Sequence, residues 1–169
     1  GARVRAGGET HRFDAVVLAA GAGTATLAAE TGIDLPSALE HHARFTFPLP
    51  DPPDARRPAW IDSPPVGLHT YQHRSGPGRW SVGGTVDAAS VAWELGRQAA
   101  TIASREVVLE YVRERLTVAP RVVETLYCTH APATGDGITF ARNGPVVAVW
   151  GENLMKFAPV LGEALATAA

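Results

Sequence analysis

Two residues that each occur once carry the clearest chemical signal in this sequence. Lys156 is the only lysine among fifteen basic side chains, and the other fourteen are arginine. Lysine is a compact charge with a tunable pKa, whereas arginine is a planar fork that stays charged. A lysine retained in an arginine-rich background favours a specific chemical role, and chance retention on a surface is the alternative.

Cys128 is the only cysteine, so no disulfide can form within the chain. Single cysteines fit a reducing compartment, and the expected location is the cytoplasm. A thiolate is a nucleophile, which makes Cys128 a candidate for covalent chemistry. The alternative is a cysteine packed as a small hydrophobic side chain.

Two continuous apolar runs are expected to position these residues. Residues 15–20 and 146–150 are typical of strands buried on both faces, as in a parallel sheet. Each run leads into a glycine-containing turn and then a predicted helix, over 24–30 and 154–168 respectively. This order indicates nucleotide-binding architecture. The first turn does not match GxGxxG, because Thr26 stands at the third glycine position, so as a phosphate cradle it is weak.

The middle of the chain predicts an antiparallel sheet with one helix. Strands are expected at 43–47, 67–73, 80–84 and 121–127. Ser104 is the predicted N-cap of a helix whose apolar stripe is Val107, Val108, Tyr111, Val112 and Leu116. A short hairpin is expected near the start, at 3–5 and 10–13.

Composition and spacing exclude several classes of function. The net charge of −2 offers no electrostatic footprint for nucleic acid. No apolar run approaches the roughly 18 residues of a membrane span. His69 and His73 lie in a predicted strand, too far apart to share a metal.

Two further expectations concern single residues. The adjacent pair His41 and His42 is expected at a solvent-exposed segment boundary. The ring of Trp150 is a candidate for the active site.

Three blocks together resemble the D-amino-acid oxidase superfamily, most closely its sarcosine oxidase branch. The first is residues 13–22, a strand and turn like the family's AAGAW segment. The second is residues 128–132 followed by Gly135-Asp136-Gly137, similar to a stretch whose cysteine carries covalent flavin. The third is residues 146–159, similar to the family's strand, GHGFKFAP turn and terminal helix.

The resemblance implies an α/β plus α+β fold. Residues 1–36 and 137–169 would be pieces of a split, Rossmann-like FAD-binding domain, and residues 37–136 part of an antiparallel-sheet substrate domain. The intact protein would oxidise a secondary amine or amino acid to an imine with FAD as hydride acceptor. The nucleotide fingerprint is expected upstream of Gly1, on a missing N-terminal FAD-binding segment or subunit. Without it, the chain is expected to bind FAD poorly. The apolar runs 15–20 and 146–150 are then expected to have exposed faces that need cover, so that the chain self-associates or pairs with that partner.

The resemblance also implies a set of site residues. Lys156 and Asn153 would be catalytic, and Cys128 would carry the flavin if attachment is covalent. The remaining cofactor-binding positions would be Ala20, Gly21, Ala22, Gly151, Glu152, Leu154 and Met155. The turn at 151–155 is expected to begin the final helix. Its free backbone N–H groups would then face the negative charge of the reduced flavin.

Five positions depart from the family pattern. Asn153 replaces a histidine, Glu152 a glycine, and His130-Ala131 an aromatic-threonine pair. Ser81 stands where a second lysine, associated with oxygen activation, would lie. Flavin binding is therefore better supported than oxidase activity. The alternatives are a flavin amine dehydrogenase and a non-catalytic binding or assembly module that complements a separate FAD-binding chain.

Overall fold

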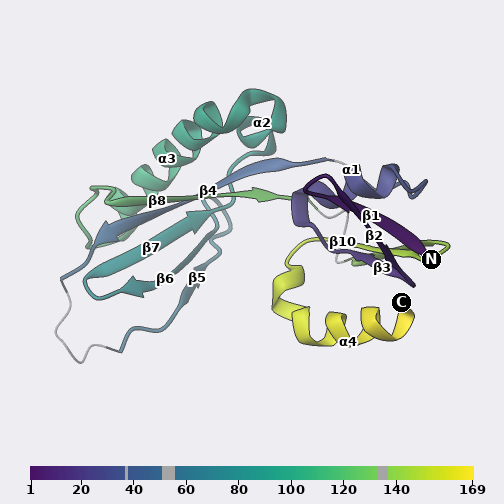
Figure 1. Cartoon of the computed structure of the whole chain (residues 1–169). Helices are drawn as coiled ribbons and strands as arrows, with labels where there is room; N and C mark the ends of the chain where they lie inside the picture. Colours follow the sequence, from purple (N-terminus) through teal and green to yellow (C-terminus); the bar gives the residue numbers. More distant parts are fainter. Residues whose placement is uncertain (37, 51–55, 133–136) are drawn as a thin grey trace. The chain divides into compact units, whose positions relative to one another are not determined.

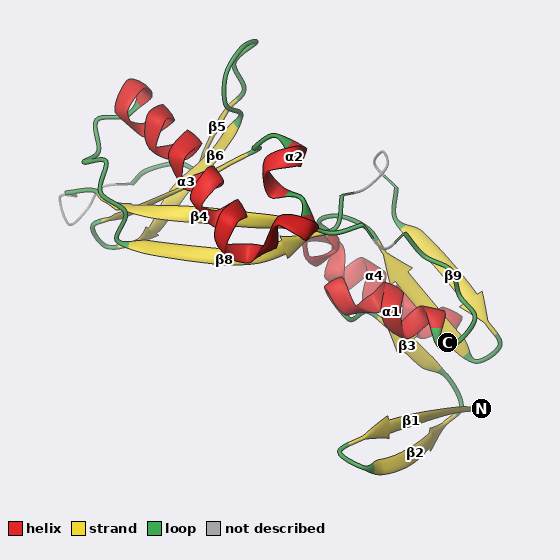
Figure 2. Ribbon diagram, turned by 90° about the horizontal axis from the view of Figure 1, so that it is seen from above, coloured by secondary structure: helices red, strands yellow, loops and turns green. Residues whose placement is uncertain are grey.

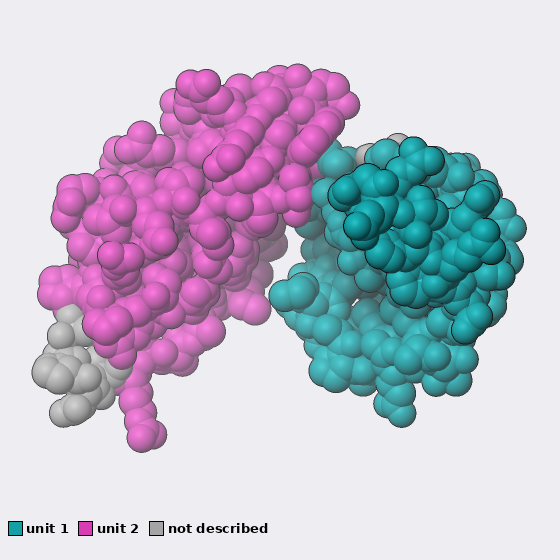
Figure 3. All heavy atoms as spheres, viewed as in Figure 1, with its two compact units in different colours: residues 1–39, 130–169 teal, residues 40–129 magenta. Residues whose placement is uncertain are grey.

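The computed structural model describes residues 1–36, 38–50, 56–132 and 137–169. The chain forms two compact units, shown in separate colours in Figure 3. Unit 1 comprises Gly1–Leu39 and His130–Ala169, and unit 2 comprises Glu40–Thr129. These boundaries differ by three and seven residues from those expected, 36/37 and 136/137. Gly135 and Asp136, part of a predicted turn, lie outside the described residues.

Unit 1 contains a hairpin and a three-stranded sheet (Figure 1). Strands β1 (Ala2–Ala6) and β2 (Glu9–Phe13) pair antiparallel, as predicted. The sheet has the order β3-β10-β9. Strand β10 (Val146–Trp150) runs parallel to β3 (Val16–Leu18) and antiparallel to β9 (Thr139–Asn143). The parallel pair confirms the arrangement expected from the two apolar runs.

Strand β10 is buried along its whole length, and both of its faces are covered within unit 1. Val146, Ala148 and Trp150 pack with residues of α1 (Thr24–Ala29) and its following loop. Val147 and Val149 pack with Leu165 of α4 on the opposite face. The expectation that this strand exposes an apolar face was therefore wrong. Trp150 is 5% exposed and serves as a core side chain, which corrects its assignment as an active-site ring.

The final helix begins later than predicted. Leu154–Phe157 forms a 3₁₀ turn, and α4 spans Ala158–Ala168. Pro159 occupies the first turn of α4, where its missing N–H costs nothing and its fixed φ suits the helix. The turn after β3 has the same order of elements: the 3₁₀ turn Gly21–Gly23 comes directly before α1.

Unit 2 is a five-stranded sheet with the order β5-β6-β7-β4-β8. Its strands are β4 (Glu40–Pro48), β5 (Trp60–Asp62), β6 (Thr70–Gly76), β7 (Arg79–Gly84) and β8 (Glu124–His130). Pairs β5–β6, β6–β7 and β7–β4 are antiparallel, as predicted for this region. The short α2 (Ala88–Val91) and the 3₁₀ turn Trp93–Leu95 lead into α3 (Gly96–Arg115), which lies across one face of the sheet (Figure 2).

Alternation along β4 explains which face α3 covers. Ala43, Phe45 and Phe47 point into the core, where they meet Val108 and Val112 of α3. Val108, Tyr111 and Val112 of the predicted helical stripe are thus confirmed as core residues, whereas Val107 is not part of this core and Leu116 lies just beyond the end of α3. The predicted start was wrong, because α3 begins at Gly96 and Ser104 lies buried in mid-helix. Its Oγ donates to the carbonyl of Ala100 at 2.8 Å, the bond that lets a serine sit inside a helix.

The same alternation corrects the expectation for the histidine pair. His41 is 5% exposed, because β4 starts at Glu40 and places this side chain toward the interior. Its ring stacks on Trp93 with centroids 4.7 Å apart, and Nδ1 lies 2.7 Å from the hydroxyl of Tyr127. None of the helices in the described ranges is long and apolar enough to cross a membrane.

Candidate functional site

The two predicted cofactor turns follow adjacent parallel strands and leave the same end of the unit 1 sheet. Leu18 of β3 pairs with Ala148 of β10, so the turn at 20–22 and the turn at 151–155 both leave the carboxyl ends of these strands. Ligands of open α/β sheets bind beyond the carboxyl ends of the strands. The structure therefore places the residues predicted at the two turns beyond the same end of the sheet, namely Ala20, Gly21, Ala22, Gly151, Glu152, Leu154 and Met155.

Two glycines give these turns their shape. Gly21 has φ +56, in the left-handed region that favours glycine, and nothing lies within 4 Å of a Cβ placed there. At Gly151 a Cβ would lie 3.1 Å from the carbonyl oxygen of Gly137 and 3.3 Å from the side chain of Leu154. The first turn is open to a ligand, and the second is closely packed beneath.

Glu152 links two other polar residues of unit 1. Its carboxylate lies 3.1 Å from Nε2 of His130 and accepts a hydrogen bond from Nδ2 of Asn153 at 2.8 Å. Asn153 adopts a left-handed conformation with φ 59. All three positions depart from the family pattern, and here Glu152 contacts both of the other two side chains. Those shared departures were the only sequence signal for this contact.

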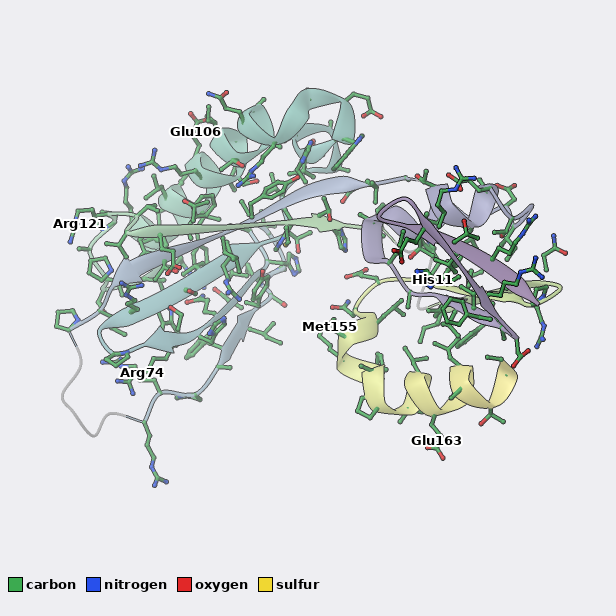
Figure 4. All side chains as sticks on the ribbon, in the orientation of Figure 1. His11, Arg74, Glu106, Arg121, Met155 and Glu163 are labelled. Atoms are coloured by element: carbon green, nitrogen blue, oxygen red, sulfur yellow. The ribbon has the colours of Figure 1, made fainter. Side chains whose placement is uncertain are left out.

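Lys156 lies in the 3₁₀ turn, with an exposed side chain. Within the described part of the chain, no carboxylate forms an ion pair with its ammonium group. Its backbone N–H donates to the carbonyl of Asn153 at 3.0 Å, so this group is not available to a ligand. The expectation that residues 151–155 open the final helix is corrected, because a 3₁₀ turn at Leu154–Phe157 comes before α4, which begins at Ala158. Met155, labelled in Figure 4, is 90% exposed on the same turn.

Unit 2 presents polar side chains on the sheet face opposite α3, which we term the open face. Pairing places Arg44 and Tyr71 on either side of Gly83, and Thr46 and His73 on either side of Ser81. His42 of β4 and Cys128 of β8, which contact each other, also belong to this face. The residues of the open face used below are His42, Arg44, Thr46, Tyr71, His73, Ser81, Gly83 and Cys128.

Three titratable side chains form a row across the open face. His42 Nδ1 lies 3.2 Å from Cys128 Sγ, and His42 Nε2 lies 3.5 Å from the hydroxyl of Tyr71. The His42 and Tyr71 rings stack at 20°. Burial raises the pKa of the Tyr71 phenol, an effect opposed by the nearby Arg44 and reinforced by Cys128.

A second bridge crosses β7 beside the first. Arg44 donates from a terminal guanidinium nitrogen to Nε2 of His73 at 3.0 Å. Beneath it, Ser81 is fully buried and its Oγ lies 2.8 Å from Oγ1 of Thr46. Arg44 Nε is buried, and no hydrogen-bond partner lies within reach in the described residues. The open face therefore carries a cation that is not neutralised by a carboxylate among these residues.

Cys128 is exposed in β8 and does not pack as a small core hydrophobe. Desolvation raises the pKa of its thiol above the ordinary value, and the charge of Arg44 partly offsets this. His42, Arg44, Tyr71 and His73 were not predicted as site residues. The period-two alternation of β4 and β6 was the available signal, because it places them on the face opposite the apolar residues.

The described residues hold no group of three or more His, Cys, Asp or Glu side chains arranged to bind a metal ion.

Residues 1–168 match the model of a protein family described as FAD dependent oxidoreductase. No curated protein matches the chain. Among solved structures, the FAD dependent oxidoreductase PA4991 from Pseudomonas aeruginosa is similar, with 22% sequence identity and a TM-score of 0.49. The match covers 95% of this chain and 47% of that one, so the chain spans about half the length of this relative.

Proposed function

The chain belongs to the FAD dependent oxidoreductase family, and on that premise we propose that it forms part of a flavoprotein that oxidises a secondary amine or amino acid to an imine. The observation that carries the proposal is the placement of two turns beyond the carboxyl ends of β3 and β10, with the exposed Lys156 on one of them. The sequence blocks that form these turns are those that resemble the sarcosine oxidase branch.

We expect the two turns to contact the FAD cofactor. When bound, FAD supplies the two-electron chemistry, and the protein supplies orientation and electrostatics. The open turn at Ala20–Ala22 would contact the nucleotide portion, because Gly21 leaves space for close approach. Gly151, Glu152, Leu154 and Met155 would lie along the flavin. These assignments rest on the resemblance and on the position of both turns at the same end of the sheet.

Lys156 and Asn153 are the proposed catalytic residues. The Lys156 ammonium would hold either a substrate carboxylate or the negative charge that develops around the flavin N1 and C2 carbonyl. Asn153 would be held in place by its hydrogen bond to Glu152. Asn153 has a left-handed backbone conformation and directly precedes the 3₁₀ turn that carries Lys156.

The pyrophosphate and adenosine of FAD would be bound by residues outside these 169, because the sequence contains no GxGxxG fingerprint. In the described structure β3 is an edge strand, and Val17 is 38% exposed. We expect a further FAD-binding segment or subunit to cover that strand. In its absence, the exposed edge favours self-association.

Cys128 is the proposed attachment point if the flavin is covalent. Its exposed sulfur and the neighbouring His42 support this assignment, and its raised pKa opposes it because attachment requires the thiolate. Denaturation of the purified flavoprotein distinguishes the two states: a thioether keeps the flavin with the polypeptide, whereas non-covalent flavin is released. The reduced thiol also favours the cytoplasm as the proposed compartment.

A second candidate is a flavin amine dehydrogenase. Ser81 supplies no cation at the position aligned with the family's oxygen-activating lysine, and its hydroxyl is occupied by Thr46. An oxidase would re-oxidise rapidly with dioxygen, whereas a dehydrogenase would require another acceptor. We propose to reduce the full-length protein and to follow re-oxidation with dioxygen and with an artificial quinone acceptor. Failure of the purified full-length protein to bind any flavin would instead support the binding-module alternative.

A further inference from the structure

Unit 2 contains a cavity of about 300 Å³ on the sheet face that α3 covers, which is the face opposite the open face. Gln72 lines the cavity and hydrogen-bonds to Tyr111 of α3, which identifies the face. Trp60 of β5 pairs with Gln72 of β6, so the two side chains lie on the same face of the sheet. Gln72 is 3% exposed, whereas Trp60 is 59% exposed. The cavity is therefore closed toward the middle of the sheet and accessible at the β5 edge.

The polar groups at the closed end are paired with one another. Trp80 Nε1 donates to Oε1 of Gln72 at 3.0 Å, and Nε2 of Gln72 donates to the Tyr111 hydroxyl at 2.7 Å. The Tyr111 hydroxyl donates in turn to Oδ2 of Asp62 at 2.8 Å. Each of these groups has its partner within the protein, so this end of the cavity forms a fixed wall. The chain of hydrogen bonds ends on a carboxylate whose position is set by Tyr111.

Arg115, in the last turn of α3, is a lining residue with unused hydrogen-bond donors. Its Nη2 lies 3.4 Å from Oδ2 of Asp62, longer than an ordinary N–H···O hydrogen bond. Within the described residues its guanidinium makes no other hydrogen bond or ion pair. A guanidinium has five N–H donors in a planar fork and binds a carboxylate through two parallel hydrogen bonds. Arg115 therefore has donors for an acidic group while Asp62 holds it in place.

The charges around the cavity favour a ligand with a single negative charge. The charged lining residues are two arginines, Arg57 and Arg115, and one acid, Asp62. A monoanion matches this excess of one positive charge. A dianion such as phosphate would bring a second negative charge close to the Asp62 carboxylate, and an ammonium group would meet two guanidinium groups. A carboxylate is therefore the charged group that fits.

Trp60 supplies apolar surface for the remainder of the ligand. Its indole ring lies at the accessible end of the cavity, and Leu49 and Leu116 also line it. Aromatic rings stack in offset or edge-to-face arrangements that add to the gain from burial. A cavity of about 150 Å³ is enough for benzene. The volume of about 300 Å³ therefore has room for one ring and a short acidic side chain.

We propose that this cavity binds a small aryl carboxylate, with the ring of the ligand against Trp60 and its carboxylate on the guanidinium of Arg115. Asp62 is a positioning residue, because it holds the guanidinium and is itself held by the hydrogen bond from Tyr111. Every residue of this site belongs to unit 2. The inference therefore does not depend on flavin or on amine oxidation, and it assigns a separate small-molecule site to the chain.

The test is isothermal titration calorimetry of the full-length protein with phenylacetate and with phenylacetamide, which share the ring and differ in charge at one end. The variants are Trp60→Ala and Arg115→Gln, and Arg115→Lys keeps the charge without the fork. The matched controls are Ile61→Ala, at the exposed neighbour of Trp60, and Arg113→Gln, in the same turn of α3. Neither control residue lines the cavity.

Two of the variants keep the result interpretable. Trp60→Ala changes an exposed side chain, so it carries the test if Arg115→Gln does not fold. Lys156→Met is measured beside the others, because the proposed flavin site also presents a cation to an acid. It separates binding in the unit 2 cavity from binding at the unit 1 turns.

We expect phenylacetate to bind with one-to-one stoichiometry and a dissociation constant on the order of 1 mM. Phenylacetamide should bind at least tenfold more weakly than phenylacetate. Trp60→Ala and Arg115→Gln should each weaken phenylacetate binding at least tenfold, and Arg115→Lys should weaken it less. The two controls and Lys156→Met should bind as the wild type does.

Three results would overturn the proposal: no saturable binding of phenylacetate, equal affinity for the two probes, or unchanged affinity in Trp60→Ala or Arg115→Gln. Loss of binding in Lys156→Met alone would place the acid at the unit 1 turns and would overturn it as well.

Discussion

The ring of Tyr71 lies directly over the α-carbon of Gly83, with the position of a missing Cβ only 2.3 Å from Tyr71 Cζ and 2.4 Å from its hydroxyl oxygen. Real Cβ atoms do not approach so closely, so any larger residue at 83 displaces the ring. Gly83 and Ser81 of β7 have small or absent side chains. Side chains of β6 and β4 can therefore contact each other across β7.

Gly83→Ala should therefore destabilise unit 2 and break the Tyr71–His42 contact. Because the ring is partly exposed and can swing away, we expect a loss of about 1 kcal/mol, the lower end for overpacking. Urea denaturation measures it. Gly162→Ala in α4, where a Cβ meets nothing within 4 Å, is the control and should instead stabilise its helix by about 0.5–1 kcal/mol. In the background Tyr71→Ala the penalty of Gly83→Ala should vanish. An equal penalty in both backgrounds would show that the ring is not the obstacle.

The Cys128 thiol should alkylate more slowly than a free thiol at neutral pH. Desolvation raises the pKa of this thiol above that of a free cysteine. At neutral pH the reactive thiolate is therefore scarcer in the protein than in a free thiol. Arg44→Met removes the charge that lowers this pKa and should slow the reaction further at pH 7. Iodoacetamide labelling of flavin-free protein, followed by intact mass across a pH series, measures both effects. Faster labelling of Cys128 than of a cysteine peptide at pH 7 would contradict this account.

Gln72 is the centre of a buried polar network beneath the sheet. Its amide nitrogen donates to the Tyr111 hydroxyl at 2.7 Å, and its oxygen accepts from Trp80 Nε1 at 3.0 Å. Gln72→Leu leaves the indole N–H without its acceptor, which should lower the free energy of unfolding by about 1–3 kcal/mol. The same change at the exposed Gln98 should stay within about 0.5 kcal/mol. Similar midpoints for the two variants would indicate that the network rearranges at little cost.

Elements with a strong period were predictable from the sequence. The parallel strands around Val17 and Val147 were identified because continuous apolar runs are typical of parallel strands, although only β10 is buried along its whole length and β3 is a partly exposed edge strand. The start of α3 was missed at Ser104 because a serine can cap a helix or bond back to the preceding turn, and only packing decides between these.

Site residues that are unique in the sequence were predicted, and those whose contacts depend on strand order were not. Lys156 and Cys128 were found because each is unique in composition. Tyr71, His42 and Arg44 were missed because their meeting depends on strand order, and the order β6-β7-β4-β8 is set by long-range pairing. Gly83 alone gives no hint of the ring it accommodates. The proximity of His130, Glu152 and Asn153 depends in the same way on the return of the chain from β8 to the end of β10.

Loss of Lys156 should damage catalysis more than loss of any other cation in unit 1. Lys156→Met is expected to slow flavin reduction tenfold or more, equivalent to about 1.4 kcal/mol of barrier. Lys156→Arg should restore only part of the rate, because the guanidinium is larger and planar. Stopped-flow reduction of the full-length variants measures this, with Glu163→Gln on the exposed side of α4 as control (Figure 4). Wild-type rates in Lys156→Met would leave this lysine an ordinary surface residue.

The central claim is that this chain forms part of a flavoprotein that takes hydride from the carbon beside an amine nitrogen. Anaerobic titration of the full-length holoprotein with secondary amines and amino acids, followed by flavin absorbance and mass spectrometry of the products, tests it most directly. We predict that one equivalent of substrate bleaches one equivalent of flavin, and that the imine or its hydrolysis products accumulate in the same amount. A bound flavin that stays oxidised with every amine and amino acid, and is reduced instead by another class of donor, would contradict the account.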